Sequence, residues 1–219
     1  MRLGTILLAT VGLSLMAAAP PEGGLLNLEK TPVGQLPPGW SAAKTGQGPG
    51  SVWKVVEDRS APGGPKVLAQ TSAEGANALF NLCIADRTSF QDLDLSVALK
   101  SVAGKIDQGG GPIWRCRDAN NYYIARMNSL EDNFRLYKVV DGKRRELYSA
   151  EIKAPPAGQW HTIRIVHQGK HIRCFLNGKA LIEIDDDTFA GPGKIGLWTK
   201  ADAQTRFADL KIRAPGGTP

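Results

Sequence analysis

Residues 120–147, NNYYIARMNSLEDNFRLYKVVDGKRREL, alternate apolar and polar side chains over several short runs. Such alternation is typical of antiparallel strands that have one face on a hydrophobic core. Asp141-Gly142 is a strong signal for a two-residue hairpin, because a type I′ turn needs positive φ at both central positions. The stretch therefore predicts a meander of antiparallel strands, and its polar positions are mostly Arg, Tyr and Asn.

The rest of the chain has the same character. Short β-rich runs are separated by turn-forming residues, and no long stretch has a 3.6-residue period. Many short strands at this spacing are typical of a sandwich or barrel. We therefore predict an all-β fold, a two-sheet antiparallel jelly-roll sandwich. The expected strands are 51–57, 66–71, 79–85, 94–100, 113–118, 121–128, 133–140, 143–150, 160–167, 171–177, 180–185, 194–199 and 205–213.

The first residues are expected to be a leader rather than part of this fold. Ile6–Met16 is an apolar run after a basic start, and Ala17-Ala18-Ala19 offers small residues for cleavage. The protein is then secreted or periplasmic, and no other apolar stretch approaches the ~20 residues that a membrane span needs. The predicted parts are a signal peptide at 1–19, a short linker at 20–26, one sandwich domain at 27–213 and a flexible tail at 214–219.

The charge and the cysteines argue against several function classes. The formal net charge of +6 is spread along the chain without a block of Lys and Arg, so no nucleic-acid partner is expected. Cys83, Cys116 and Cys174 form no CxxC motif and have no His at metal-ligand spacing, which argues against zinc. Their odd number leaves at least one thiol unpaired within the chain, and we expect buried free thiols.

The turns set an expected register for the meander. Asp118 should pair with Asn121, residues 129–132 should form the next loop, and Asp141-Gly142 the last turn. Cross-strand partners share a face, and a slip of one residue would bury arginines among apolar side chains. The predicted pairs on the buried face are Trp114 with Ala125, Cys116 with Tyr123, Met127 with Phe134, and Leu136 with both Ala125 and Leu147.

A second hairpin is predicted with its turn at Gln168-Gly169. This turn places Ile165 opposite Ile172 and Ile163 opposite Cys174, and all four side chains face the core. The alternation again leaves the polar residues of both strands on the outer face.

The opposite face of the meander is rich in hydrogen-bonding side chains. Arg126 and Arg135 should be cross-strand neighbours, where like charges are destabilising unless an anion lies between them. One interpretation is an internal network in which Glu131, Asp132 and Glu146 neutralise the arginines. The other is a ligand site, because Arg suits carboxylates and hydroxyls, and Tyr suits the C–H face of a sugar. The candidate binding residues on this face are Arg115, Tyr122, Arg126, Asn128, Asn133, Arg135 and Tyr137.

Two phrases, NYYIARMNSLEDN (121–133) and GKIGLWTKAD (193–202), lie in a pattern that extends from about Asn27 to Arg213. This pattern resembles the concanavalin-A-like lectin and glucanase superfamily. More narrowly, it is similar to exported bacterial 3-keto-disaccharide hydrolase-like proteins, which are also called family 16 glycoside hydrolase-like. The resemblance implies a concave sheet that holds a saccharide. Trp198 and Lys200 are two residues apart in one strand, so they share a face, and both could belong to the concave face. It implies catalysis less directly, because the superfamily mixes lectins, binding modules and hydrolases.

Few residues are candidates for catalysis. Glu131 and Asp132 are the candidate acid and base if loop 129–132 folds over the site. The alternative is that both cap a turn and neutralise the arginines. The run EIDDD at 183–187 resembles the acidic strand of family 16 enzymes, but its last carboxyl is Asp rather than Glu. A surface ion pair at a strand end explains this run adequately.

No cofactor is expected, apart from a structural Ca²⁺ for which Asp209 is the candidate side-chain ligand. The sequence predicts an exported carbohydrate-binding domain that holds a saccharide on its concave sheet. One alternative is a glycoside hydrolase that uses carboxylates at the same face. The other is a structural or adhesion domain without a small ligand. Whether the protein is an enzyme stays open at this point.

Overall fold

The computed structural model describes Leu26 and residues 28–213, so the predicted signal peptide and tail lie outside the described residues. These residues form two antiparallel sheets of seven strands each, which confirms the predicted sandwich. No helix long and apolar enough to cross a membrane occurs among them. The strands are β1 (Trp40–Thr45), β2 (Trp53–Glu57), β3 (Lys66–Gln70), β4 (Phe80–Ala85), β5 (Leu93–Ala103), β6 (Gly109–Asp118), β7 (Asn121–Asn128), β8 (Asn133–Val140), β9 (Lys143–Glu151), β10 (His161–Gln168), β11 (His171–Leu176), β12 (Lys179–Asp185), β13 (Lys194–Lys200) and β14 (Gln204–Arg213).

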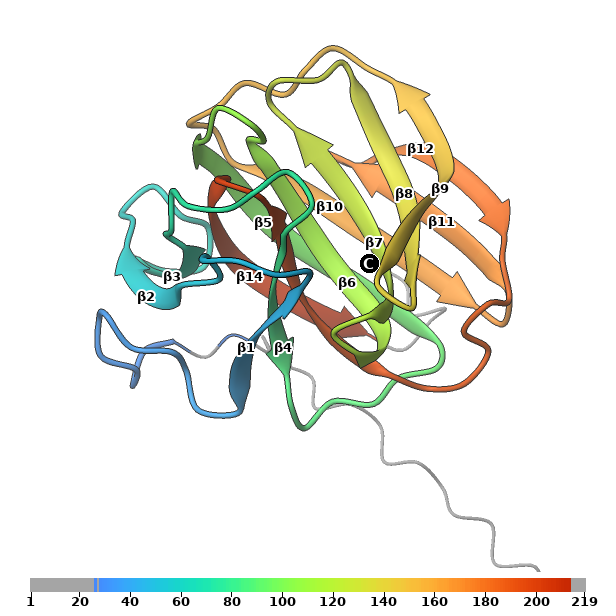
Figure 1. Ribbon diagram of the computed structural model, residues 1–219, viewed down its shortest axis with the longest axis horizontal. Coiled ribbons are helices and arrows are strands. Elements are labelled where there is room, and N and C mark those ends of the chain that lie inside the picture. The colour runs from blue at the N-terminus through green and yellow to red at the C-terminus, as the bar shows by residue number, and fades with distance from the viewer. Residues whose placement is uncertain (1–25, 27, 214–219) are drawn as a thin grey trace, which may run out of the picture.

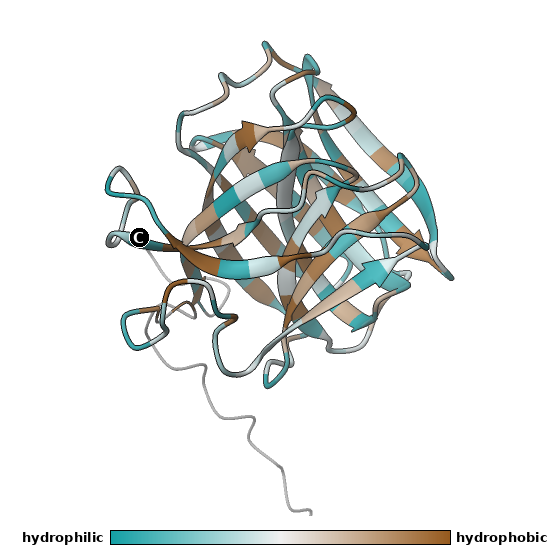
Figure 2. Ribbon diagram, turned by 60° about the vertical axis from the view of Figure 1, so that its left-hand side comes forward, coloured by the Kyte–Doolittle hydropathy of each residue, from teal (hydrophilic) through white to brown (hydrophobic). Residues whose placement is uncertain are grey.

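The first sheet has the strand order β1-β4-β13-β6-β7-β8-β9, and the second has the order β12-β11-β10-β5-β14-β3-β2. Figure 1 shows the layers face-on, with β6, β7 and β8 in front of β5, β10 and β11. Hydrophobic and hydrophilic residues alternate along many strands in Figure 2, because one side of each strand faces the core. The predicted apolar face of the meander is buried there, including Trp114, Tyr123, Met127, Phe134 and Leu136.

The β7–β8 register was predicted correctly. Met127 lies opposite Phe134, and Arg126 lies opposite Arg135. Strand β1 was missed, and β6 begins four residues before its predicted start at Ile113. The three cysteines are buried and free, as expected.

The predicted β6–β7 register was correct at the turn, where Asp118 lies opposite Asn121, but it was wrong by two residues along the rest of the hairpin. Trp114, rather than Cys116, lies opposite Tyr123. The pairing is irregular between Trp114 and Asp118, and Arg115 within this segment has a φ of 43°. A bulge of this kind reverses which side chains face which way. Cys116 therefore packs on the outer face of the sheet instead of in the core.

Two other pairs also differ from the prediction. An irregularity in the β8–β9 pairing puts Tyr148, rather than Leu147, opposite Leu136. In the β10–β11 hairpin, Ile165 pairs with Cys174, a shift of two residues from the predicted register. Because side chains alternate with a period of two, this shift leaves the same residues facing the core.

The outer face of the first sheet is concave. In a flat sheet, β4 and β9 would lie about 24 Å apart, because neighbouring strands are about 4.8 Å apart. The guanidinium carbon of Arg144 on β9 nevertheless lies 5.1 Å from the ring centroid of Phe80 on β4 and 5.9 Å from that of Trp198 on β13. The hydroxyl groups of Tyr122 on β7 and Thr45 on β1 are 2.6 Å apart. The sheet must curl to make these contacts, and we call the space it encloses the hollow.

One end of the hollow is apolar, and the other is polar. The apolar end is a hydrophobic cluster separate from the core between the sheets. This cluster consists of Phe80, Leu82, Ile84, Ile113, Cys116, Tyr122, Ile124, Val139 and Trp198. The polar end lies where β6 begins and β7 ends, and it holds most of the predicted site residues.

Candidate functional site: the polar end of the hollow

Glycines on β6 allow this strand to lie unusually close to its neighbour β7. Gly111 pairs with Trp198 of β13 and lies level with Arg126 of β7 on its other side. A Cβ atom on Gly111 would lie 1.8 Å from the carbonyl oxygen of Ala125, so β6 and β7 approach too closely for another residue. Consequently, no side chain from β6 separates Trp198 from Arg126.

Arg126 is the central cation of this site. It is only 2% exposed, and its Nη2 donates to Glu131 Oε2 over 3.0 Å and to Tyr137 Oη over 3.2 Å. Its Nε and Nη1 are buried and have no hydrogen-bond partner among the described residues. An unpaired buried donor costs about 1–3 kcal/mol, and more if charged. Buried groups of this kind are rare in native proteins and call for a ligand or water.

Glu131 ties several polar side chains together. Its carboxylate accepts hydrogen bonds from Arg126, from Asn128 at 3.0 Å and from Asn133 at 3.2 Å, and it lies 3.5 Å from Arg135 Nη1. Burial raises the pKa of Glu131, but the charge and hydrogen bond of Arg126 outweigh burial and hold the pKa below its ordinary value. Glu131 is thus an ionised partner of the arginines, one of the two roles that the sequence left open.

Asp107 is the acidic residue that the predicted site lacked. It is 1% exposed, and its Oδ2 lies 3.7 Å from Lys200 Nζ. Its Oδ1 has no hydrogen-bond partner within the described chain. Burial raises the pKa of Asp107, although the positive charges of Arg126 and Lys200 oppose this effect. A buried carboxyl group with a raised pKa next to cations is typical of proton-transfer sites.

The loop that carries Asp107 is held in place by Asp202. The Asp202 carboxylate accepts hydrogen bonds from the backbone N–H groups of Lys105, Ile106 and Asp107, over 2.7, 3.1 and 3.0 Å. Gly104 precedes them with a φ of 145°, and a Cβ atom there would clash with the Asp107 carbonyl oxygen. The only sequence signal for this loop is the position of Asp107 two residues before the glycine run that begins β6 at Gly109.

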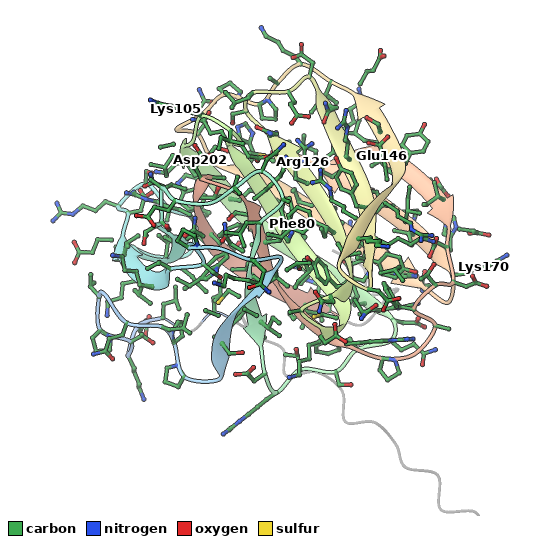
Figure 3. All side chains as sticks on the ribbon, viewed as in Figure 1. Phe80, Lys105, Arg126, Glu146, Lys170 and Asp202 are labelled. Carbon is green, nitrogen blue, oxygen red and sulfur yellow. The ribbon has the colours of Figure 1, made fainter. Side chains whose placement is uncertain are left out.

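The structure brings many of the predicted residues to the polar end. Figure 3 shows Arg126 near the middle of the sheet, Glu146 to one side, and Lys105 and Asp202 to the other. Hydrogen bonds and an ion pair connect six of the predicted residues, which are Arg126, Asn128, Glu131, Asn133, Arg135 and Tyr137. Lys200 lies 3.7 Å from Asp107, whereas Trp198 belongs to the apolar cluster of the hollow.

Three predicted residues lie elsewhere. Tyr122 is at the apolar end, where its hydroxyl contacts Thr45 and where burial raises its pKa. The Asp132 carboxylate accepts a hydrogen bond from the backbone N–H of Ala154 and takes no part in the Glu131 network. Arg115 is not in the hollow at all, because the irregularity in β6 turns it toward the end of the sandwich.

Arg115 is fully engaged with the backbone. It is unexposed, and Nε donates to Gln91 O at 2.8 Å, Nη1 to Phe189 O at 2.8 Å and Nη2 to Gly169 O at 2.7 Å. Nη2 also lies 3.4 Å from the exposed carboxylate of Asp92. Arg115 thus joins three separate segments, which is a structural role.

The remaining acidic candidates are on the second sheet. Glu183 and Asp185 lie on the edge strand β12, and each has a carboxylate oxygen 2.9 Å from a ring nitrogen of His171. The Asp209 carboxylate accepts a hydrogen bond from Lys211 Nζ at 2.8 Å. Within residues 26 and 28–213, no group of three or more His, Cys, Asp or Glu side chains is placed to hold a metal ion. Calcium bound by Asp209 stays a prediction.

A family model described as the 3-keto-alpha-glucoside-1,2-lyase-like domain matches residues 34–213. The chain belongs to this family. The match confirms the family resemblance found in the sequence, and it covers every residue of the polar end. No relative was found among curated proteins.

Solved structures similar to this 3-keto-alpha-glucoside-1,2-lyase-like domain share its fold at low identity. The carbohydrate-binding module CBM66 from Bacillus subtilis has a TM-score of 0.63 and 16% identity, covering 80% of this chain and 96% of its own. A putative glycosyl hydrolase from Parabacteroides distasonis ATCC 8503 has a TM-score of 0.52 and 20% identity, covering 74% and 89%. The carbohydrate recognition domain of Emp47p has a TM-score of 0.57 and 13% identity, covering 89% and 94%.

Proposed function

We propose that this domain binds a saccharide at the polar end of the hollow. The proposal rests on one observation: the unpartnered Nε and Nη1 of Arg126 and the unpartnered Oδ1 of Asp107 are buried at the same end of the hollow. Sugar hydroxyls both donate and accept hydrogen bonds, so a saccharide can pair with both residues. The family description and the carbohydrate-binding relatives support this class of ligand.

The predicted signal peptide at residues 1–19 is part of the proposal, since it would place the binding site outside the cytoplasm. The protein would meet its saccharide in the periplasm or in the external medium. A fusion of residues 1–26 to a reporter that is active only after export tests this location. Retention of the reporter in the cytoplasm would contradict it.

Binding is tested with an oligosaccharide array, followed by calorimetric titration of the best ligand. Arg126→Met should weaken binding about 100-fold, because each hydrogen bond to a charged group contributes about 1.5–3 kcal/mol. Arg145→Met is the matched control, since Arg145 is exposed on β9. An affinity that is the same in Arg126→Met as in the unmodified protein would show that the saccharide binds elsewhere.

A second function, cleavage of a 3-keto glucoside, is favoured by the family and by Asp107. In a 1,2-elimination, a base removes the proton from C2, which the C3 ketone makes acidic. The C1–O bond then breaks, a C1=C2 double bond forms, and the leaving oxygen takes up a proton. We propose Asp107 as the base and Arg126 as the group that stabilises negative charge on the C3 oxygen.

This second function is tested by incubating the protein with a 3-keto disaccharide and with its unoxidised parent. Asp107→Asn should abolish turnover of the keto sugar while the binding of the parent persists. Glu131→Gln should only reduce turnover, because Glu131 holds Arg126 rather than touching C2. Full activity of Asp107→Asn would exclude it as the base, and cleavage of the parent alone would indicate a hydrolase.

A further inference from the structure

The hollow carries more positive charge than its carboxylates neutralise. Glu131 lies within 4 Å of two of its arginines, and Glu146 lies 3.3 Å from Arg135. The one remaining carboxylate is Asp107, whose pKa is raised by burial and whose distance from Lys200 is 3.7 Å. The cations of the hollow are Arg126, Arg135, Arg144 and Lys200.

Arg144 is the cation without a counterion. Within the described part of the chain, no carboxylate oxygen lies within 4 Å of it. Its guanidinium carbon lies 4.4 Å from the Tyr137 ring centroid, 5.1 Å from Phe80 and 5.9 Å from Trp198, and its buried Nη1 has no hydrogen-bond partner there. Cation–π contacts of this kind contribute about 0.5–2 kcal/mol. Aromatic rings, however, supply no net negative charge.

Arg126 adds two more donors next to the same aromatic ring. Its guanidinium carbon lies 5.9 Å from the Tyr137 centroid, so Arg126 and Arg144 both border Tyr137. Among the described residues of the hollow, four donors are buried without a partner: Arg126 Nε, Arg126 Nη1, Arg144 Nη1 and Trp198 Nε1. The unpartnered acceptors are two, Asp107 Oδ1 and Asn133 Oδ1. The hydroxyl groups of a neutral sugar can accept from these donors, but they carry no charge and so leave the excess positive charge of the hollow unneutralised.

We infer that the hollow selects a saccharide that carries a carboxylate, as a uronic acid does, over its neutral counterpart. This inference rests on the proposed saccharide binding and names its ligand class. A carboxylate has acceptors only and a full negative charge, and the planar guanidinium group matches its geometry. Arg144 is the residue that sets the preference, since its charge is the one that no protein carboxylate neutralises.

The test uses immobilised glucose oligosaccharides in matched sets that differ only at C6: a hydroxymethyl, a carboxylate or a sulfate group. The carboxylate form should bind at least tenfold more tightly than the neutral form. Arg144→Gln should reduce this preference to less than threefold. Arg145→Gln is the matched control, because successive residues of a strand point to opposite faces, and it should keep the full preference. Raising the salt concentration should weaken binding of the carboxylate form but not binding of the neutral form.

The outcomes separate this inference from the proposed function. Equal binding of the neutral and carboxylate forms overturns the inference and leaves saccharide binding intact. Tighter binding of the sulfate form, or a preference that persists in Arg144→Gln, also overturns it. If neither these glycans nor any on the wider array bind, both the inference and the proposed function are wrong.

Discussion

Arg115 and Arg126 are buried arginines on adjacent strands of one meander, but their guanidinium groups are in different states. All three nitrogens of Arg115 donate to backbone carbonyl oxygens. Only one nitrogen of Arg126 has partners among the described residues. A buried charge with fixed backbone acceptors stabilises the fold, whereas one with free donors can serve a ligand. The contrast therefore separates a structural arginine from a functional one.

The surroundings explain the difference. Arg115 sits where the loops at Gln91, Gly169 and Phe189 converge, and their carbonyl groups are fixed by the fold. Arg126 lies in the hollow, where Glu131 and Tyr137 are its hydrogen-bond acceptors among the described residues. Evolution tolerates such unsatisfied groups mainly where activity compensates for lost stability.

The largest expected effect is on stability, at Arg115. Arg115→Met should lower the free energy of unfolding by about 3–5 kcal/mol, because it removes three hydrogen bonds made by a buried charged group, one of them to the buried carbonyl of Phe189. Urea denaturation measures this change, with Arg145→Met as the exposed control. A loss below 1 kcal/mol would mean that the carbonyl groups find other partners and that Arg115 is no structural anchor.

The next effect is a gain of stability at Asp107. Its folded-state pKa is raised, so the stability that this carboxyl contributes is present below the unfolded-state pKa of 3.8 and is lost as the pH rises through the folded value. Asp107→Asn removes that loss, and its melting temperature at pH 7 should exceed that of the unmodified protein by ~2–4 °C. The difference should vanish near pH 3, and a difference independent of pH would contradict the assignment.

Arg126 should matter less for stability than either of these residues. Arg126→Met leaves Glu131 with Asn128, Asn133 and Arg135 as partners. We therefore expect unfolding free energies within about 1 kcal/mol of the unmodified protein, together with the loss of saccharide binding given above. A destabilisation as large as that of Arg115→Met would remove the distinction between the two arginines.

The smallest effect is expected on the second sheet. Glu183 is exposed on β12 and contacts His171, far in the fold from the hollow. Glu183→Gln should leave saccharide binding, any turnover of keto sugars and the melting temperature unchanged within experimental error. A loss of turnover in this variant would support the alternative hypothesis that the acidic run at 183–187 is a catalytic strand.

The amino-acid sequence alone predicted much of the site. Strand parity put Arg126, Asn128, Arg135 and Tyr137 on one face, and the structure keeps them there. The Glu131 network was foreseen as one of two alternatives. Asp107 was not assigned to the site, because its proximity to Lys200 depends on a loop that Asp202 holds from a distant part of the chain.

The sequence by itself determined which side chains of most strands face the core, because a period of two distinguishes the faces of a strand and survives a two-residue shift such as that of the β10–β11 hairpin. Only the tertiary structure decided that Arg115 leaves the sheet face and that Arg144 reaches Phe80 across a curled sheet. A bulge and a curl depend on contacts between residues far apart in the chain, and a local pattern of apolar and polar residues carries no record of them.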